Sequence, residues 1–387
     1  MKKAIIAVAS VFVGLALASA VELASTAHGA AADQIPIGHY GSLTGGTATF
    51  GTSSREGIDL AADEINAAGG VLGKKIRVYH EDDQSKPEEA VTAVQKLINQ
   101  DHVVGLIGEV ASSRSLAAAP IAQRSRIPML SPSSTNPKVT QVGDYIFRAC
   151  FIDPFQGAAM ANFAMNQLKL KKFAVLYDVK NDYSIGLREF FIDTVKKNGG
   201  EIVADESYGE GDIDFKAQLT KIKQDNPEAI YVPGYYTEVG LICRQARELG
   251  MPIPLMGGDG WDSDKTCEIG RDAVNGCYFT NHYSPDEDRP EVKRFVEAYK
   301  KKYDGKTPDA MAILGYDAMK MMAAAIARAG STRGPAIRNA LAATKDFPGA
   351  SGTITIDKNR NAQKPIVVLK IEGGKFKFIT SIKPAQN

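Results

Sequence analysis

Apolar and polar positions alternate along the chain with two periods, one typical of strands and one of helices. Short apolar runs such as Ile35–Tyr40 and Val103–Gly108 predict buried strands. Between them, Ser54–Ala67 carries apolar residues three and four positions apart, which predicts an amphipathic helix that Gly69 and Gly70 terminate. The same alternation of strand and helix continues to Met256. It predicts an α/β protein whose parallel sheets carry helices on both faces.

The series of strands restarts near residue 150, and the strands are too numerous for one small sheet. We therefore predict two α/β lobes. Beyond residue 283 the pattern is mainly helical, and the end of the chain predicts antiparallel strands separated by Gly-Gly and Asn turns. The expected late helices are Pro290–Tyr303, Ala310–Ala329 and Gly334–Thr344, and the expected late strands are Gly352–Ile356, Ile366–Glu372 and Lys375–Ile379.

Residues 1–32 have the pattern of a secretory signal peptide. A positive start is followed by the apolar run Ala4–Ala18 and by small residues. Cleavage motifs occur at Ala18–Ala20 and at Ala30–Ala32, and we favour the later one because polar, foldable sequence begins at Asp33. A retained membrane anchor is the alternative, but the run is short for a spanning helix.

Composition excludes several classes of partner. The chain has 387 residues, of which 44% are hydrophobic and 24% charged, and its formal net charge is +1. These values are ordinary for a globular protein, and no basic block supports nucleic-acid binding. After the first 32 residues, no segment looks long and apolar enough to span a bilayer.

The four cysteines predict one disulfide and no metal site. Cys267 and Cys277 flank a short polar loop in a chain expected to be exported, so we predict that they are bonded. Cys150 and Cys243 lie in apolar segments and are expected to be buried thiols. No CxxC pair occurs and the five histidines are scattered, so we expect neither a metal nor a cofactor.

Two hydroxyl-rich turns follow neighbouring predicted strands in the first lobe. Ser112, Ser113 and Ser115 come after Val103–Gly108, and Ser131–Pro137 follows the next strand. Ligands of parallel α/β sheets bind at the carboxyl ends of strands, and helix N-termini there offer N–H donors to anions. This edge suits a carboxylate, although plain capping and turn formation would explain the same residues.

The corresponding strand ends of the second lobe offer an acidic group and aromatic rings. Tyr183, Tyr235 and Trp261 follow three of its predicted strands, and Asp259 lies in the loop Gly257–Gly260. A zwitterionic α-amino acid would fit between the two edges, with its ammonium group on Asp259. The alternative for Asp259 is an ordinary Asp-Gly turn, and the aromatic residues could serve packing alone.

Catalytic motifs are missing from the sequence. It has no GxSxG elbow, HExxH motif, Walker loop or GxGxxG fingerprint, so we do not expect an enzyme. An exported hydrolase built on Ser112 or Ser133 would need a nearby general base, and only His39 and His282 lie near predicted strand ends.

Several strings resemble one family over essentially the whole mature chain. They are GSLTGGTATFG, GIDLAADEINAAGGVLGKKI, SPSSTNPKVT, YDVKNDYSIG, VPGYYTEVG and LMGGDGW. The chain resembles the periplasmic leucine/isoleucine/valine-binding proteins of ABC transporters. The resemblance implies a type I periplasmic binding protein fold with crossovers near Phe151, His282 and Gly352. The implied lobes are residues 33–151 with 283–352, and residues 152–282 with 353–387.

The resemblance also implies a ligand set. Ser112, Ser133 and Thr135 match positions that contact the carboxylate and ammonium groups in the family, and Asp259 matches the acidic ligand of the ammonium. That acidic residue is often glutamate in leucine binders. The aspartate side chain is shorter, so its charge would lie further from the ligand. The expected walls of the side-chain pocket are Phe50, Tyr183 and Tyr235.

Together these features predict a monomeric periplasmic protein that binds an aliphatic or small aromatic α-amino acid by domain closure and delivers it to a membrane permease. Branched-chain amino acids are favoured. Members of the resembled family also take amides, urea and aromatic acids, and these remain open. A third possibility is a periplasmic sensing partner of a signalling receptor, because the same fold occurs in receptors.

Overall fold

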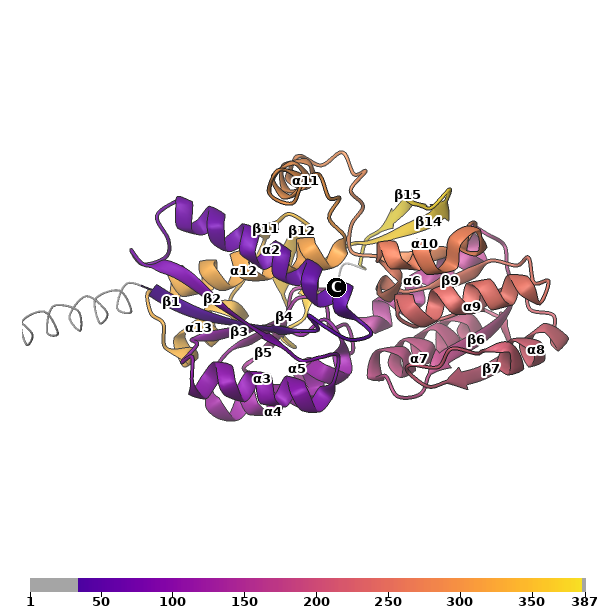
Figure 1. Cartoon of the computed structure of the whole chain (residues 1–387), viewed down its shortest axis with the longest axis horizontal. Coiled ribbons are helices and arrows are strands. Elements are labelled where there is room, and N and C mark those ends of the chain that lie inside the picture. The colour runs from indigo at the N-terminus through magenta and orange to yellow at the C-terminus, as the bar shows by residue number, and fades with distance from the viewer. Residues whose placement is uncertain (1–33, 385–387) are drawn as a thin grey trace, which may run out of the picture.

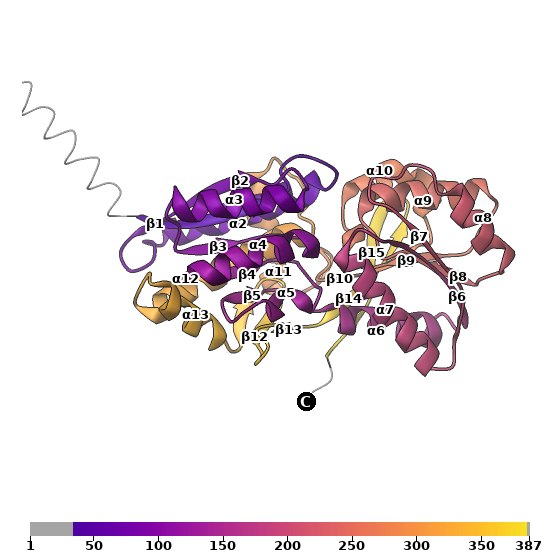
Figure 2. The ribbon, with the colours of Figure 1, turned by 90° about the horizontal axis from the view of Figure 1, so that it is seen from below.

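The computed structural model describes residues 34–384, which form two α/β lobes side by side (Figures 1 and 2). The expected signal peptide, residues 1–32, lies outside the described residues. Each lobe has a central sheet with helices on both faces, so the predicted α/β class is confirmed.

The first lobe is built on a five-stranded parallel sheet of order β2-β1-β3-β4-β5. Its strands are β1 (Gln34–Gly41), β2 (Lys75–Asp82), β3 (Gly105–Ile107), β4 (Met129–Ser131) and β5 (Ile146–Arg148). Its helices are α2 (Ala48–Ala67), α3 (Pro87–Asn99), α4 (Ser112–Ser125), α5 (Lys138–Gln141), α11 (Pro290–Lys302), α12 (Ala310–Ala329) and α13 (Gly334–Ala342).

Both faces of this sheet carry apolar side chains, and helices bury each face. One face packs on α2, α12 and α13, for example through Ile58, Met319 and Leu341. The other face packs on α3 and α4, for example through Val94 and Ala118. By length and composition α12 could cross a membrane, contrary to expectation, but 78% of its most apolar window is buried in this core.

The second lobe is built on a seven-stranded sheet of order β15-β14-β10-β9-β8-β6-β7. Strands β6 to β10 run parallel to one another, and β14 pairs antiparallel with β10 and with β15, as the end of the sequence predicts. The strands are β6 (Lys172–Asp178), β7 (Glu201–Tyr208), β8 (Ala229–Tyr231), β9 (Leu255–Gly257), β10 (Tyr278–Asn281), β14 (Ile366–Glu372) and β15 (Lys375–Ile382).

Helices also cover both faces of the second sheet. Helices α6 and α7 pack on one face through residues such as Phe163 and Phe191, and α8 and α9 pack on the other through Leu219 and Ile242. The elements are α6 (Asp153–Asn166), α7 (Asp182–Lys197), α8 (Lys216–Gln224), α9 (Tyr236–Glu248), α10 (Asp264–Gly270) and the 3-10 turns η1 (Asp259–Trp261) and η2 (Arg271–Val274).

The chain passes between the two sheets after β5, after β10 and before β14. The first two passages lie near Phe151 and near His282. The third was expected near Gly352, where β12 (Gly352–Ile356) begins. However, β12 pairs with β11 (Phe347–Gly349) and β13 (Ala362–Gln363), and Ile354 is buried in the core of the first lobe. The structure therefore has the third passage just before Ile366.

The cysteines differ from expectation. All four are free thiols in the structure, so the predicted bond between Cys267 and Cys277 is not formed. Cys277 instead packs with Cys243 of α9 in one buried cluster, and Nη2 of Arg247 lies 3.8 Å from its sulfur. The interaction of the two thiols lowers the pKa of Cys277 and raises that of Cys243. The short loop between Cys267 and Cys277 was not sufficient to predict a bond, because the packing of the helices decides which thiols lie close together.

Candidate functional site

The carboxyl ends of the two sheets face each other, and every residue predicted for the site lies where they meet. In the first lobe, β3 and β4 are parallel neighbours that lead into Ser112 and into the turn that follows Ser131. In the second lobe, β6, β8 and β9 lead into Tyr183, Tyr235 and Asp259. All seven are buried: Phe50, Ser112, Ser133, Thr135, Tyr183, Tyr235 and Asp259.

Hydroxyl groups form the side of the site contributed by the first lobe. The Ser112 hydroxyl accepts a hydrogen bond from the backbone N–H of Asn136 at 3.2 Å and so ties the two turns together. Capping, the alternative explanation of these serines, does not apply to α4, because its cap is Ala111 and no side chain makes the capping bond. The hydroxyl of Thr135 is buried and has no hydrogen-bond partner among the described residues.

Glu109 is a buried residue that supports the hydroxyl-rich turn, and sequence analysis did not single it out. The Ser42 hydroxyl donates a hydrogen bond to its Oε1 at 3.0 Å, and Nε of Arg114 lies 3.1 Å from its Oε2. Both Glu109 and Arg114 are buried. Burial and the charge of Glu109 raise the pKa of neighbouring Asp83 to about 8, which Arg114 partly opposes. The hydroxyls of Ser131 and Ser134 donate to the backbone carbonyl of Glu109 at 2.7 and 2.9 Å, so the turn is tied to this buried polar network.

Asp259 is the acidic group of the site, and it contacts both lobes. The Ser133 hydroxyl lies 3.4 Å from its Oδ2 across the boundary between the lobes. Within the second lobe and its hinge, Nε2 of Gln156 donates to Oδ1 at 2.7 Å, and Nε2 of His282 lies 3.0 Å from Oδ2. The interpretation of Asp259 as a simple turn residue does not account for these contacts, because they are made by its side chain.

Gln156 is a functional candidate that sequence analysis missed, and His282 was considered there only as the base of a possible hydrolase and as a crossover position. Burial lowers the pKa of His282, against the effect of Asp259, so the imidazole is neutral at pH 7. Its ring stacks on Phe151 with centroids 3.8 Å apart. The only available signal was position, because both residues lie at or just after an expected crossover.

Aromatic rings form the rest of the enclosure. Tyr183 and Tyr235 stack with centroids 5.3 Å apart, and Phe50 of the first lobe meets Tyr235 edge to face at 5.5 Å. The hydroxyl of Tyr183 accepts a hydrogen bond from the backbone N–H of Gly260 at 3.2 Å, next to Asp259. Tyr236 also contacts Phe50 edge to face, with ring centroids 4.9 Å apart. Trp261 points away from this group, since its indole N–H donates to the carbonyl of Val232 in the core.

Polar contacts around the site hold the two lobes together. Asp182 of α7 receives hydrogen bonds from two residues of the first lobe, Ser113 at 3.0 Å and Asn136 at 2.7 Å. On the other rim, the backbone N–H of Thr49 donates to Tyr236 at 3.3 Å, and its hydroxyl lies 3.1 Å from that of Ser263. The site is therefore enclosed with the lobes in contact.

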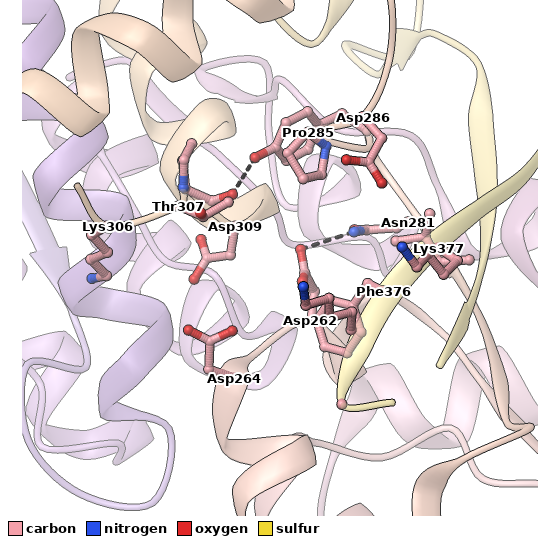
Figure 3. A pocket seen from close by; sticks show the side chains of 15 residues that line it. Asp262, Asp264, Asn281, Pro285, Asp286, Lys306, Thr307, Asp309, Phe376 and Lys377 are labelled. Carbon is pink, nitrogen blue, oxygen red and sulfur yellow. Dashed lines mark hydrogen bonds between the residues drawn. The ribbon is translucent and has the colours of Figure 1, made fainter. Parts of the chain in front are cut away.

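A separate cavity of about 400 Å³ lies beside the hinge (Figure 3). Four aspartates line it, Asp262, Asp264, Asp286 and Asp309. Asp262 accepts hydrogen bonds from Asn281 at 2.9 Å and from the backbone N–H of Ala310, the first residue of α12, at 2.7 Å. Within residues 34–384, no three acidic, histidine or cysteine side chains are placed to hold a metal ion.

Comparisons with known proteins agree with this architecture. The family profile described as "Periplasmic binding protein" matches residues 34–375. A Leu/Ile/Val-binding protein homolog of Brucella melitensis is 32% identical over 368 residues, which cover 94% of this chain and 98% of that protein. The leucine-, isoleucine-, valine-, threonine- and alanine-binding protein of Pseudomonas aeruginosa is 31% identical over 92% of this chain and 94% of its own length.

Solved structures give the same result. The leucine-binding protein LivK of Thermotoga maritima is 44% identical with a TM-score of 0.87, over 90% of this chain and 99% of that one. The branched-chain amino acid binding protein LivJ of Streptococcus pneumoniae, in complex with isoleucine, is 36% identical with a TM-score of 0.86, over 91% of this chain and all of that one. The resemblance read from the sequence motifs is confirmed: this chain belongs to the periplasmic binding protein family and has its type I fold of two α/β lobes.

Proposed function

We propose that this protein is the periplasmic solute-binding component of an ABC importer and that it binds an aliphatic or small aromatic α-amino acid, with branched-chain amino acids favoured. The observation that carries the proposal is the pairing of a hydroxyl-rich edge with Asp259 and aromatic rings inside one buried interlobe site. Support comes from relatives that bind leucine, isoleucine and valine.

Each part of a zwitterionic amino acid has a complement in this site. The hydroxyls of Ser112 and Thr135, with the backbone of Ser133, would take the carboxylate and share the ammonium group. Asp259 would neutralise the ammonium, because removing a charge from water is costly unless it is paired. Phe50, Tyr183 and Tyr235 would enclose the side chain, where burial of apolar surface adds affinity.

Closure of the lobes is the proposed mechanism, and no bond is made or broken. The ligand would touch both lobes and stabilise their closed arrangement, which membrane permease subunits would recognise. We propose hinge bending at the passages near Phe151, near His282 and before Ile366, with export to the periplasm directed by residues 1–32. The protein would act as a monomer.

An aromatic carboxylate is a second candidate, favoured by one observation. Both oxygens of Asp259 already have donors in this chain, Gln156 and His282. A ligand without an ammonium group could therefore bind without leaving Asp259 unpaired. A related solute-binding protein of Rhodopseudomonas palustris, 28% identical with a TM-score of 0.82, was solved with 3,4-dihydroxybenzoic acid.

Calorimetric titration of refolded, ligand-stripped mature protein tests both candidates. Leucine, valine, phenylalanine, glutamate, urea and benzoate would be compared on the wild type and on Asp259→Asn. Saturable binding of an α-amino acid that is largely lost in Asp259→Asn supports the amino-acid site. If benzoate binds and Asp259→Asn does not change its affinity, the proposed transport role stands, but the ligand is an aromatic carboxylate and not an amino acid. Turnover of ester or amide substrates would contradict a pure binding function.

A further inference from the structure

A second cavity, of about 490 Å³, lies at the hinge, and His282 forms part of its wall. Its walls come from both lobes: Arg289 and Thr353 belong to the first lobe, and Val367 and Lys383 to the second. None of the seven residues of the candidate site lines it, and it is distinct from the aspartate-lined cavity of Figure 3. This hinge cavity therefore shares only His282 with the interlobe site.

The two ring nitrogens of His282 have different surroundings. Nε2 lies 3.0 Å from Oδ2 of Asp259 and carries the proton, because a carboxylate only accepts hydrogen bonds. The neutral ring then has an acceptor at Nδ1. The side chain is fully buried, and Nδ1 has no hydrogen-bond partner among residues 34–384. A buried acceptor without a donor costs free energy, so a ligand of the hinge cavity gains by supplying one.

The charges near His282 favour a neutral donor over a cationic one. Burial lowers the pKa of His282, Asp259 opposes this effect, and the positive charge of Lys364 lowers the pKa further. Lys364 is itself buried and donates to the hydroxyl of Ser351, which lines the cavity. A second cation beside Nδ1 would be repelled by Lys364, whereas a hydroxyl group would not.

The charged residues that line the hinge cavity leave one positive charge without a partner. Glu287 pairs with Arg289 at 2.9 Å, and Glu291 pairs with Arg294 at 3.4 Å. Lys383 follows β15, is exposed, and makes no ion pair within the described part of the chain. A carboxylate is a suitable partner for this ammonium group.

We propose that the hinge cavity binds a small hydroxy acid, whose hydroxyl group donates to Nδ1 of His282 and whose carboxylate lies beside Lys383, and that His282 couples this binding to the interlobe site. The inference adds a second ligand to the proposed function. It does not depend on which solute the interlobe site takes.

The coupling favours solute binding for two reasons. A hydrogen bond to Nδ1 polarises the ring and strengthens the bond from Nε2 to Asp259. The hydroxy acid also touches walls from both lobes and so stabilises the arrangement in which the lobes are in contact. Because coupling between two binding sites is reciprocal, the solute tightens binding of the hydroxy acid by the same factor.

Calorimetric titration of the ligand-stripped mature protein tests the site directly. The probe is 3-hydroxybutanoate, with butanoate, which lacks the hydroxyl donor, and 1,3-butanediol, which lacks the carboxylate, as matched analogues. We expect 3-hydroxybutanoate to bind in the millimolar range, as suits a ligand of this size, and the analogues to give no measurable binding. Lys383→Gln should abolish the binding. The control is Lys301→Gln, an exposed lysine of α11 outside the cavity.

Leucine titrations with and without saturating 3-hydroxybutanoate test the coupling. We expect leucine to bind about fivefold tighter with the hydroxy acid present. Lys383→Gln should remove this gain and leave leucine affinity without the hydroxy acid unchanged. Weaker leucine binding would show competition for the interlobe site and overturn the inference, and an unchanged affinity would overturn the coupling.

Absence of binding by 3-hydroxybutanoate, equal binding of butanoate, or undiminished binding in Lys383→Gln would also overturn the hinge site. The proposed function fails separately: if leucine and other amino acids do not bind while 3-hydroxybutanoate binds and is lost in Lys383→Gln, the hinge site stands and the amino-acid site does not.

Discussion

The Nε2 atom of His282 lies 3.0 Å from Oδ2 of Asp259, and both side chains are buried at the hinge between the lobes. A carboxylate only accepts hydrogen bonds, so the imidazole carries its proton on Nε2 and holds the acidic group in place. The hinge is thereby connected directly to the residue proposed to bind the ammonium group.

Replacement of His282 by phenylalanine tests this connection. The phenyl ring keeps the stacking on Phe151 and removes the hydrogen bond to Asp259. We expect about 10-fold weaker binding of the amino acid, because hydrogen bonds to charged groups contribute about 1.5–3 kcal/mol. Calorimetric titration measures the change. In the double variant with Asp259→Asn the two losses should not add, and full additivity would contradict positioning of Asp259 by His282.

Phe50 is expected to select for the size of the ligand side chain. It is fully buried and contacts Tyr235 and Tyr236 edge to face. We expect Phe50→Ala to weaken leucine binding about 10-fold or more through lost apolar contact, and to lower stability by about 3 kcal/mol. Alanine as a ligand shares the charged groups of leucine and serves as the control. Equal losses for leucine and alanine would show general damage instead of a lost side-chain wall.

Asn136 is expected to stabilise the closed arrangement without touching the ligand's side chain. Its Nδ2 donates to the carbonyl of Asp182 in the other lobe at 2.7 Å. We expect Asn136→Ala to weaken ligand binding about fivefold, in line with about 1 kcal/mol for one hydrogen bond, and to favour a more open shape. Binding assays and small-angle X-ray scattering measure the two effects. Thr92→Ala is the control, because that exposed hydroxyl donates to the carbonyl of Glu88 within α3 at 3.2 Å.

The raised pKa values of Asp262 and Asp309 predict that the free energy of unfolding falls as pH rises. Burial and the charge of Asp309 raise the pKa of Asp262 to about 7, and burial raises that of Asp309 to about 6. Both folded values exceed the usual value of 3.8, so the folded state binds these protons more tightly than the unfolded state. Their contribution to stability is complete below pH 3.8 and is lost as pH rises through about 6 and 7.

Urea denaturation between pH 5 and 8 measures this effect. We expect the free energy of unfolding attributable to the pair to decrease over this range, and Asp262→Asn to flatten the decrease. Asparagine still offers an oxygen to Asn281 and to the N–H of Ala310, which makes it a suitable replacement. A pH profile identical in the wild type and Asp262→Asn would show that Asp262 does not titrate in this range.

Sequence determined the fold class and the two edges of the candidate site because these depend on local pattern. Alternating apolar runs fold into buried strands and amphipathic helices in any parallel α/β protein, and strand ends such as those before Ser112 and Asp259 must meet at the ligand-binding edge. Motif resemblance then supplied the family and the assignment of Phe50, Ser133 and Thr135 to the candidate site. All seven predicted site residues come together in the structure, although their contacts with a ligand remain a proposal.

Tertiary structure decided what depends on packing between distant segments. Cys277 is buried together with Cys243 and is not bonded to Cys267, which is nearer in the sequence, because α9 packs on this face of the second sheet. Strand β12 belongs to the first lobe because Ile354 fits its core. Gln156 and His282 reach Asp259 only because the chain crosses between the lobes near Phe151 and near His282. Contacts between residues more than a hundred positions apart leave no local pattern, so folding alone brings Asp259 to Ser133 and Gln156.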